Sequence, residues 1–374
     1  MTEEKLREIF AEAGITVDGQ QPWDPQVHDQ RLYRRIARGG TIAAGESYVD
    51  GWWDCDRLDE MFYRALGTGM DRRLYSPTMT WRKLRNSVIN QQTRRKSRDV
   101  AQTHYNLRNE LYQAMLGKSL AYTCAYWVQA DSLDAAQFAK YDLVCRKLGL
   151  KPGETVLELG SGFGGLAKFM AQRYQCKVVA VDISENPVEY SRALCDGLPV
   201  QIHHCDYRDV ATYNPKYLRF DKVVSVGVFE HVGYKNYRTL MEIVHSQLKK
   251  EGLFLLHTIG GNESKNFTEP WIDKYIFPHG MLPSLKQIGA SIENLFVVED
   301  LHNFGADYDK TLMAWHKNFV EHWDQLRSNY DPRFYRKCCY YLLSCAGGFR
   351  ARTMQLWELV LSPVGVAGGY KTVR

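Results

Sequence analysis

Short apolar runs alternate with segments of helical periodicity across the centre of the chain. Between the runs, hydrophobic residues recur at the three- and four-residue spacing of amphipathic helices. This alternation predicts an α/β fold with a mostly parallel sheet and helices on both faces. Five runs have the length of a buried strand: 154–159, 177–182, 199–204, 221–227 and 252–259. The later segments 293–300 and 354–361 can add two strands, which predicts a seven-stranded sheet.

The N-terminal part of the chain has a different character. Residues 3–13 have an amphipathic helix pattern. Aromatic and acidic residues alternate in the segment 45–58, which contains no group that looks catalytic. We expect residues 1–90 to form a small separate domain that can contact a membrane or a second copy. We expect residues 91–103 to be a basic linker and residues 104–374 to be the catalytic domain.

The stretch 156–165, Val-Leu-Glu-Leu-Gly-Ser-Gly-Phe-Gly-Gly, organises the predicted sheet. It begins as a buried strand, enters a glycine turn and is followed by the helix pattern of 166–174. Glycines leave room for a nucleotide against the backbone, and the free N–H groups at the start of a helix can bind it. We therefore expect a nucleoside cofactor at Gly160, Gly162 and Gly164.

Glu158 indicates which cofactor binds there. The spacing of the glycines alone also fits a dinucleotide such as NAD. A carboxylate two residues before Gly160 would repel a pyrophosphate, but it suits the ammonium and sulfonium charges of S-adenosylmethionine (SAM). The sequence therefore favours SAM over NAD.

Two aspartates follow the next two predicted strands. Asp182 closes the second strand at the distance from the glycines where an acid accepts both ribose hydroxyls. Its alternative role, a helix N-cap, is better filled by Ser184. Asp206 follows the third strand, where a carboxylate can accept from the adenine amino group, although it can also cap a turn together with Asp209.

An acid, an imidazole and a thiol are predicted to meet at the same sheet edge. Glu230 follows the fourth strand, and His257 lies within the apolar fifth strand, where a histidine is more often a core residue. Cys124 lies between aromatic residues in a segment that can fold over this edge. Because ligands of parallel sheets bind beyond the carboxyl ends of the strands, these three groups can form one small polar pocket.

Charge and composition restrict the class of partner. The formal net charge is only +5, but seven basic residues without an intervening acid lie close together. Such a run is often only a solvated face, and its other role here is attraction to anionic lipid head groups. Nucleic acid is disfavoured because aromatic residues are not interleaved with the run. The basic residues are Arg82, Lys83, Arg85, Arg94, Arg95, Lys96 and Arg98.

The cysteines and the hydropathy indicate the compartment. The nine cysteines include no Cys-x-x-Cys pair, which argues against a disulfide framework or a metal site and for a reducing environment. The N-terminus lacks the apolar core of a signal peptide, and no apolar run is long enough to span a bilayer. We therefore expect a cytoplasmic protein, or one peripheral on the inner face of the membrane.

Six stretches in this order resemble the cyclopropane-fatty-acyl-phospholipid synthase family, which includes the mycolic acid cyclopropane synthases. The resemblance covers about nine tenths of the chain and is weakest before residue 30 and across 70–100. Glycine loops are common, but the cysteine, glutamate, histidine and tyrosine motifs together are specific. The stretches are 122–127, 159–165, 228–233, 255–260, 275–278 and 304–309.

This resemblance implies a class I SAM-dependent methyltransferase with a Rossmann-like sheet. It implies transfer of a methylene to the cis double bond of an acyl chain carried by a membrane phospholipid, through methyl transfer, a carbocation and deprotonation assisted by bicarbonate. A homodimer is also implied. The family's bicarbonate ligands correspond to the backbone of Cys124 and Ile259 and the side chains of Glu230, His257 and Tyr308. Its cofactor contacts correspond to Tyr122, Thr123, Gly160, Gly162, Asp182, Asp206 and Tyr207.

The sequence departs from the family pattern at several cofactor positions. The family usually has Asp, Cys and Trp where Glu158, Ser161 and Phe163 stand, and often Thr at position 182. These changes roughly keep size and polarity, so they affect details of cofactor binding more than the reaction. The alternatives are a SAM-dependent lipid C-methyltransferase that leaves a methyl branch, a non-catalytic lipid- or SAM-binding protein and, least favoured by the modest charge, a nucleic-acid methyltransferase.

Overall fold

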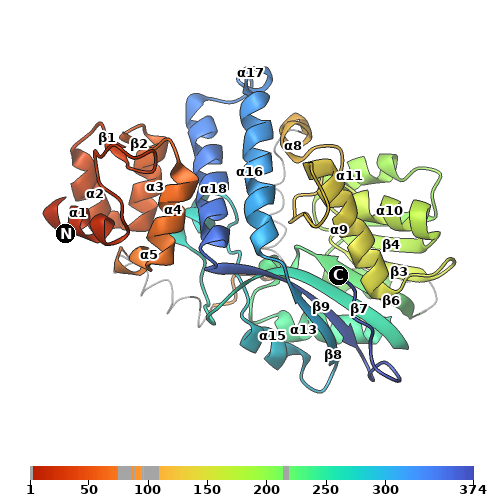
Figure 1. Cartoon of the computed structure of the whole chain (residues 1–374). Helices are drawn as coiled ribbons and strands as arrows, with labels where there is room; N and C mark the ends of the chain where they lie inside the picture. The colour runs from red at the N-terminus through yellow and green to blue at the C-terminus, as the bar shows by residue number, and fades with distance from the viewer. Residues whose placement is uncertain (1–2, 75–85, 87–88, 95, 97–108, 214–218) are drawn as a thin grey trace. The chain divides into compact units, whose positions relative to one another are not determined.

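The structure is a computed structural model that describes residues 3–74, 86, 89–94, 96, 109–213 and 219–374. The chain divides into two compact units, whose elements are labelled in Figure 1. The first unit comprises 1–89, 266–278 and 305–355, and the second comprises 90–265, 279–304 and 356–374. The first unit thus includes two later segments besides residues 1–89. The division into 1–90, 91–103 and 104–374 stays a prediction, and most of 91–103 lies outside the described residues.

The second unit is built on a seven-stranded sheet in the order β5-β4-β3-β6-β7-β9-β8. Neighbours from β5 to β7 run parallel, and β8 pairs with β9 in the antiparallel direction. This confirms the predicted fold class. The strands are β3 (Thr155–Leu159), β4 (Lys177–Asp182), β5 (Val200–His204), β6 (Phe220–Val226), β7 (Leu248–Gly261), β8 (Val297–Asn303) and β9 (Met354–Ser362).

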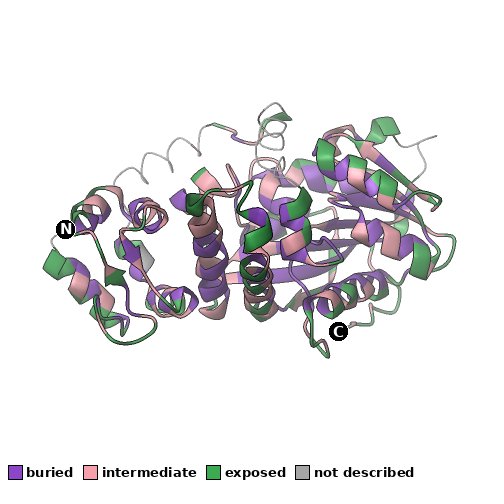
Figure 2. Cartoon of the chain, turned by 90° about the horizontal axis from the view of Figure 1, so that it is seen from above, coloured by how far each residue is buried: buried purple, intermediate pink, exposed green. Residues whose placement is uncertain are grey.

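Side chains alternate between the two faces of the sheet, and each face packs against helices. Val156 belongs to a core cluster that includes Tyr141 and Met170, whereas its neighbour Leu157 belongs to a cluster that includes Phe229 and Leu240. The central strands are buried along most of their length (Figure 2). The helices of this unit are α8 (Asn109–Leu116), α9 (Leu133–Leu148), α10 (Gly165–Tyr174), α11 (Glu185–Leu194), the 3-10 helix η1 (Tyr207–Tyr213), α12 (Phe229–Val232), α13 (Tyr237–Gln247) and α15 (Leu285–Ile292).

The strand order reverses beside β3. From β3 the chain adds β4 and then β5 on one side, and it then returns to place β6 on the other side of β3. At such a switch point the loops that follow β3 and β6 leave in opposite directions, and a crevice opens at the carboxyl ends of the two strands. This is the place where a ligand of the sheet is expected.

The first unit is mostly helical. Helix α18 packs against α3, α4 and α16, and Figure 1 shows α16 and α18 side by side. No helix in the described ranges has the length and the apolar character needed to cross a bilayer. The elements are α1 (Glu3–Glu12), β1 (Gln26–Val27), α2 (Arg31–Gly39), α3 (Thr41–Val49), β2 (Trp53–Asp54), α4 (Leu58–Gly67), α5 (Met70–Arg73), α14 (Pro270–Tyr275), α16 (Ala306–Glu321), α17 (Trp323–Leu326) and α18 (Pro332–Arg350).

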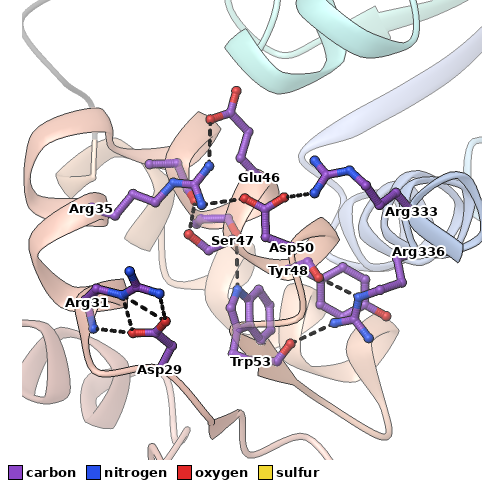
Figure 3. Close-up of polar contacts among 12 residues, drawn as sticks. Asp29, Arg31, Arg35, Glu46, Ser47, Tyr48, Asp50, Trp53, Arg333 and Arg336 are labelled. Atoms are coloured by element: carbon purple, nitrogen blue, oxygen red, sulfur yellow. Dashed lines mark hydrogen bonds and ion pairs between the residues drawn. The ribbon is translucent and has the colours of Figure 1, made fainter.

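Ion pairs join α18 to the N-terminal helices of this unit (Figure 3). Asp50 accepts from Arg35 on α2 at 2.6 Å and pairs with Arg333 on α18. Arg336, one turn further along α18, donates to the carbonyl oxygen of Tyr48 at 2.6 Å. The contacts between residues so far apart in the chain explain why 305–355 groups with the N-terminal segment.

Candidate functional site

The glycine loop lies at the carboxyl end of β3, where the crevice is expected. Gly160 and Gly162 both have positive φ values, 85° and 49°. A Cβ atom on Gly160 would overlap the side chain of Val228, which follows β6, so this glycine is required by packing within the chain. A Cβ atom on Gly162 would meet no atom within 4 Å. Gly162 therefore exposes backbone that a ligand can approach.

Gly164 serves packing in the same way as Gly160. A Cβ atom on it would lie 2.7 Å from the Cβ atom of Ser191 on α11. We expected all three glycines to make room for the cofactor. The structure shows this open space at Gly162, whereas Gly160 and Gly164 let the loop approach neighbouring segments.

Two carboxylates lie beside this loop. Asp182 at the end of β4 accepts from the backbone N–H groups of Gly162, at 2.9 Å, and Ser184, at 2.8 Å, so it fixes the loop. Glu158 on β3 is buried, and its Oε2 atom has no hydrogen-bond partner in the described part of the chain. Burial, and then the nearby charge of Asp182, raise the pKa of Glu158 to about 8. The positive charge of Lys140 lowers this pKa only in part, so the ionised form of Glu158 stays poorly stabilised.

Two further polar atoms without partners follow β5. Asp206 is buried and accepts from the Nε atom of Arg208 at 2.8 Å through Oδ1. Its Oδ2 atom and the buried hydroxyl of Tyr207 have no hydrogen-bond partner among the described residues. Burial raises the pKa of Tyr207 to about 12, so its hydroxyl keeps its proton and can donate. Both atoms are available to a ligand.

The segment that contains Tyr122 and Thr123 lies against the end of β6. A Cβ atom on Gly227, directly after β6, would lie 2.6 Å from the Thr123 side chain. The Nζ atom of Lys140 on α9 donates to the Thr123 hydroxyl at 2.9 Å. The ring of Tyr122 contacts that of Tyr112, with centroids 5.9 Å apart. These contacts hold the segment over the carboxyl end of the sheet.

Lys140 is a buried charge beside the site that was not predicted from the sequence. This lysine is buried, and burial lowers its pKa to about 8. A signal was present, because Lys140 and Lys147 are seven residues apart and therefore share one face of α9 with buried Val144. Two lysines on the apolar stripe of a helix indicate buried charges that need partners.

Glu230 and His257 both lie near the carboxyl ends of β6 and β7. Glu230 on α12 accepts from the backbone N–H of Ile259 at 2.6 Å through Oε1. His257 lies two residues before Ile259 on β7, so the two residues belong to the same face of the strand. The Oε2 atom of Glu230 and the Nε2 atom of His257 are buried without hydrogen-bond partners within the described ranges.

Burial has opposite effects on the charges of these two groups. It raises the pKa of Glu230 to about 7, because the ionised carboxylate is poorly solvated. It lowers the pKa of His257, so the imidazole is neutral. Near neutral pH part of the Glu230 population is therefore protonated and can donate a hydrogen bond, and the neutral imidazole of His257 has an unpaired Nε2 atom within the described residues.

Cys124 and Tyr308, the other two predicted anion ligands, belong to different units of the chain. Cys124 is buried directly after Thr123, and its thiol donates to the carbonyl oxygen of Ala125 at 3.3 Å. Gly227, which contacts Thr123, donates its N–H to the carbonyl oxygen of His257 at 3.0 Å, so Cys124 lies near the same strand ends. Tyr308 belongs to the first unit, on α16, where its ring contacts Trp315 and Phe349.

The basic run and the cysteines are the two other features that the sequence singled out. Of the basic run, Arg82, Lys83, Arg85, Arg95 and Arg98 lie outside the described residues. Arg94 forms an ion pair with Asp209 at 2.7 Å, and Lys96 donates to Gln91 at 2.7 Å. The nine cysteines are all free thiols, and the described ranges contain no group of three or more His, Cys, Asp or Glu side chains that could hold a metal ion.

Comparisons with known proteins are consistent with this geometry. Residues 91–359 match the family described as mycolic acid cyclopropane synthetase. The chain is 46% identical over 370 residues to the cyclopropane-fatty-acyl-phospholipid synthase of Escherichia coli strain K12, with 98% of this chain and 94% of that protein covered.

Two solved structures are similar over 71% of this chain and 97% of each of their own chains, with a TM-score of 0.65. They are the cyclopropane synthase MmaA2 from Mycobacterium tuberculosis, at 26% identity, and the mycolic acid cyclopropane synthase CmaA1 complexed with SAH and CTAB, at 27% identity.

The state of Glu158 predicts a pH dependence of SAM binding. With a pKa of about 8, Glu158 is mostly protonated at neutral pH in the free protein. A cationic ligand favours the carboxylate, so binding should lower this pKa and release a proton. The affinity for SAM should therefore rise with pH until about pH 8, and Glu158→Gln should abolish this component.

Calorimetric titration in two buffers of different ionisation enthalpy measures the released protons. S-adenosylhomocysteine, which lacks the sulfonium charge, is the matched ligand and should release fewer. Equal proton release by the parent and by Glu158→Gln would show that Glu158 does not face the cation.

Proposed function

The chain belongs to the mycolic acid cyclopropane synthetase family of SAM-dependent methyltransferases, and on that premise we propose that it cyclopropanates phospholipids. In this reaction a methylene is transferred from SAM to the cis double bond of an unsaturated acyl chain on a membrane phospholipid. One observation carries the proposal most directly: the buried Oε2 atom of Glu230 and Nε2 atom of His257 have no partners in the described structure, beside strand ends where a nucleoside cofactor fits.

The residues of the glycine loop fit SAM. The open face of Gly162 leaves space for the cofactor, and Glu158 offers an unpaired carboxyl oxygen to a positive charge. Asp206 and Tyr207 offer an acceptor and a donor at the next strand end. Asp182, which orients the loop, is proposed to bind the ribose, and Tyr122 and Thr123 to cover the cofactor. When bound, SAM supplies an electrophilic methyl group.

The chain must keep this site dry and stabilise positive charge on the acyl chain. An alkene is a weak nucleophile, so the reacting groups must be held close together and away from water. Near His257 the site carries aromatic side chains: the ring centroid of Phe304 is 5.8 Å from that of His257, and Tyr126 is 5.4 Å from Phe304. Aromatic faces stabilise a cation without bonding to it.

Glu230 and His257 are proposed to hold a small anion, bicarbonate, together with Cys124, Ile259 and Tyr308. A bound bicarbonate would supply the base for the proton that ring closure releases. The fit rests on complementarity, because a protonated Glu230 donates a hydrogen bond where an ionised one would repel the anion. The raised pKa of Glu230, caused by burial, supports the protonated form.

The substrate implies contact with a membrane. We propose a cytoplasmic protein that binds peripherally to the inner, anionic face of the membrane, with the basic run of 82–98 and the N-terminal segment as candidate contacts. Each Lys or Arg near such a surface contributes about 1 kcal/mol of attraction. We also propose that the protein is a homodimer, as the family resemblance implies.

Labelled SAM tests the proposed reaction. The purified protein is incubated with methyl-labelled SAM and vesicles of either saturated or cis-unsaturated phospholipid. We expect label only in the unsaturated lipid, and mass spectrometry should show the gain of CH2 with loss of the double bond. A methyl-branched product would favour the lipid C-methyltransferase alternative, and label in neither lipid would contradict the proposal.

The pH profile of Glu230→Gln tests the anion site. In the parent, the protonated carboxyl should be lost as pH rises past about 7, or higher with a bound anion, and kcat should fall on this alkaline side. Glutamine keeps an N–H donor at every pH, so the fall of kcat on the alkaline side should disappear. The maximum kcat should decrease by no more than about tenfold. Glu189→Gln makes the same change at an exposed position and serves as the control. An unchanged profile and rate in Glu230→Gln would exclude Glu230 from the anion site.

A further inference from the structure

Behind His257, away from its unpaired nitrogen, lies a buried ion pair that the proposed reaction does not use. The Nδ1 atom of His257 is 3.0 Å from the Oε1 atom of Glu358 on β9. The other carboxyl oxygen of Glu358 lies 2.8 Å from the Nζ atom of Lys147 on α9. The side chains of Glu358 and Lys147 are fully buried, and that of His257 is 1% exposed. Three elements that are distant in sequence thus meet in one polar contact inside the core.

The charge of Glu358 is stabilised from both sides. Burial alone would raise its pKa, but the hydrogen bond with His257 and the positive charge of Lys147 lower it to about 2. Lys147 has further partners, the Nδ1 atom of His302 at 3.0 Å and Asp300 at 3.9 Å. Asp300 in turn is held by Arg374 at 2.6 and 2.8 Å. Glu358 is therefore ionised at neutral pH.

An ionised carboxylate can only accept hydrogen bonds, and this fixes the tautomer of His257. In a neutral imidazole one ring nitrogen carries hydrogen and the other is an acceptor. Because the Nδ1 atom faces an acceptor, it must carry the hydrogen, and the Nε2 atom must be the bare nitrogen. The Nε2 atom is also the one that has no partner within the described residues.

We propose that Glu358 and Lys147 are positioning residues that hold His257 with its Nε2 lone pair directed to the ligand site. The imidazole then accepts a hydrogen bond and does not donate one, so the group bound there must present a hydrogen to it. A hydrogen-bearing oxyanion meets this requirement, whereas an oxyanion without hydrogen does not. This inference rests on the proposed function for the identity of that group, but the tautomer itself follows from the ion pair.

The test must separate positioning from folding. Removing Glu358 alone would leave Lys147 buried with less compensation, and such variants often lose stability. The double variant Glu358→Leu with Lys147→Met replaces the pair with apolar side chains of similar size, which proteins commonly tolerate. Asp300→Asn is the matched control, because it removes a carboxylate near Lys147 that does not contact His257.

The tautomer is read by NMR on protein with 15N-labelled histidine, and His257→Gln identifies the signals of this residue. We expect the parent and Asp300→Asn to show hydrogen on Nδ1 and a bare Nε2, and the double variant to show both tautomers. In the double variant, kcat for methylene transfer should fall about tenfold or more, as when a partner that orients a functional imidazole is lost, with the KM for SAM nearly unchanged.

The inference is overturned if the parent carries hydrogen on Nε2, if the double variant keeps the parent's tautomer, or if Asp300→Asn changes the tautomer as much as the double variant does. The NMR result needs no turnover. If the parent transfers no methylene to lipid, the proposed function fails, and the spectra still decide the role of Glu358 and Lys147.

Discussion

Burial of polar atoms without a partner is the constraint on which this site depends. Such an atom loses its hydrogen bonds to water, and each one costs about 1–3 kcal/mol. Several of them lie at or near the carboxyl ends of β3, β5, β6 and β7 within the part of the chain that is described, and five of these belong to the predicted site residues. They are Glu158 Oε2, Asp206 Oδ2, Tyr207 Oη, Glu230 Oε2 and His257 Nε2. A ligand that pairs with them recovers this cost, which is why the cluster indicates a binding site.

The site has two halves of opposite electrostatic character. Around the glycine loop, Glu158 and Asp182 are proposed to bind a cation, whereas Glu230, whose pKa burial raises to about 7, and the neutral His257 are proposed to bind a small anion. Lys140 donates a hydrogen bond to Thr123, and its positive charge lowers the pKa values of both Glu158 and His257. In the proposed complex, the carboxylates at the glycine loop thus bind the sulfonium donor, and separate side chains, Glu230 and His257, bind the proton acceptor.

The sequence predicted the parts of this arrangement that depend on local pattern. The strands followed from apolar runs, so the predicted ranges agree with the observed strands to within a few residues. The positions of Glu158, Asp182, Glu230 and His257 followed because each lies in or directly after such a run, and parallel strands bring their carboxyl ends to one edge.

The parts that the sequence did not reveal depend on contacts between distant residues. Glu358 is 101 positions from His257, and inside the apolar run of β9 nothing indicates its partner. The cofactor roles of Gly160 and Gly164 stay predictions, but no local pattern indicates that their lack of a Cβ also makes room for the side chains of Val228 and Ser191. The grouping of 305–355 with the first unit depends on α18 packing against α3 and α4, which no local pattern predicts.

A crystal structure with S-adenosylhomocysteine and bicarbonate would show whether the unpaired atoms bind these ligands. We expect the five unpaired atoms to lie within hydrogen-bond distance of these ligands, or of waters that the ligands order. The bare Nε2 atom of His257 should face the hydrogen-bearing oxygen of the anion. A structure in which these atoms are paired with other protein groups, while the ligands bind elsewhere, would contradict it.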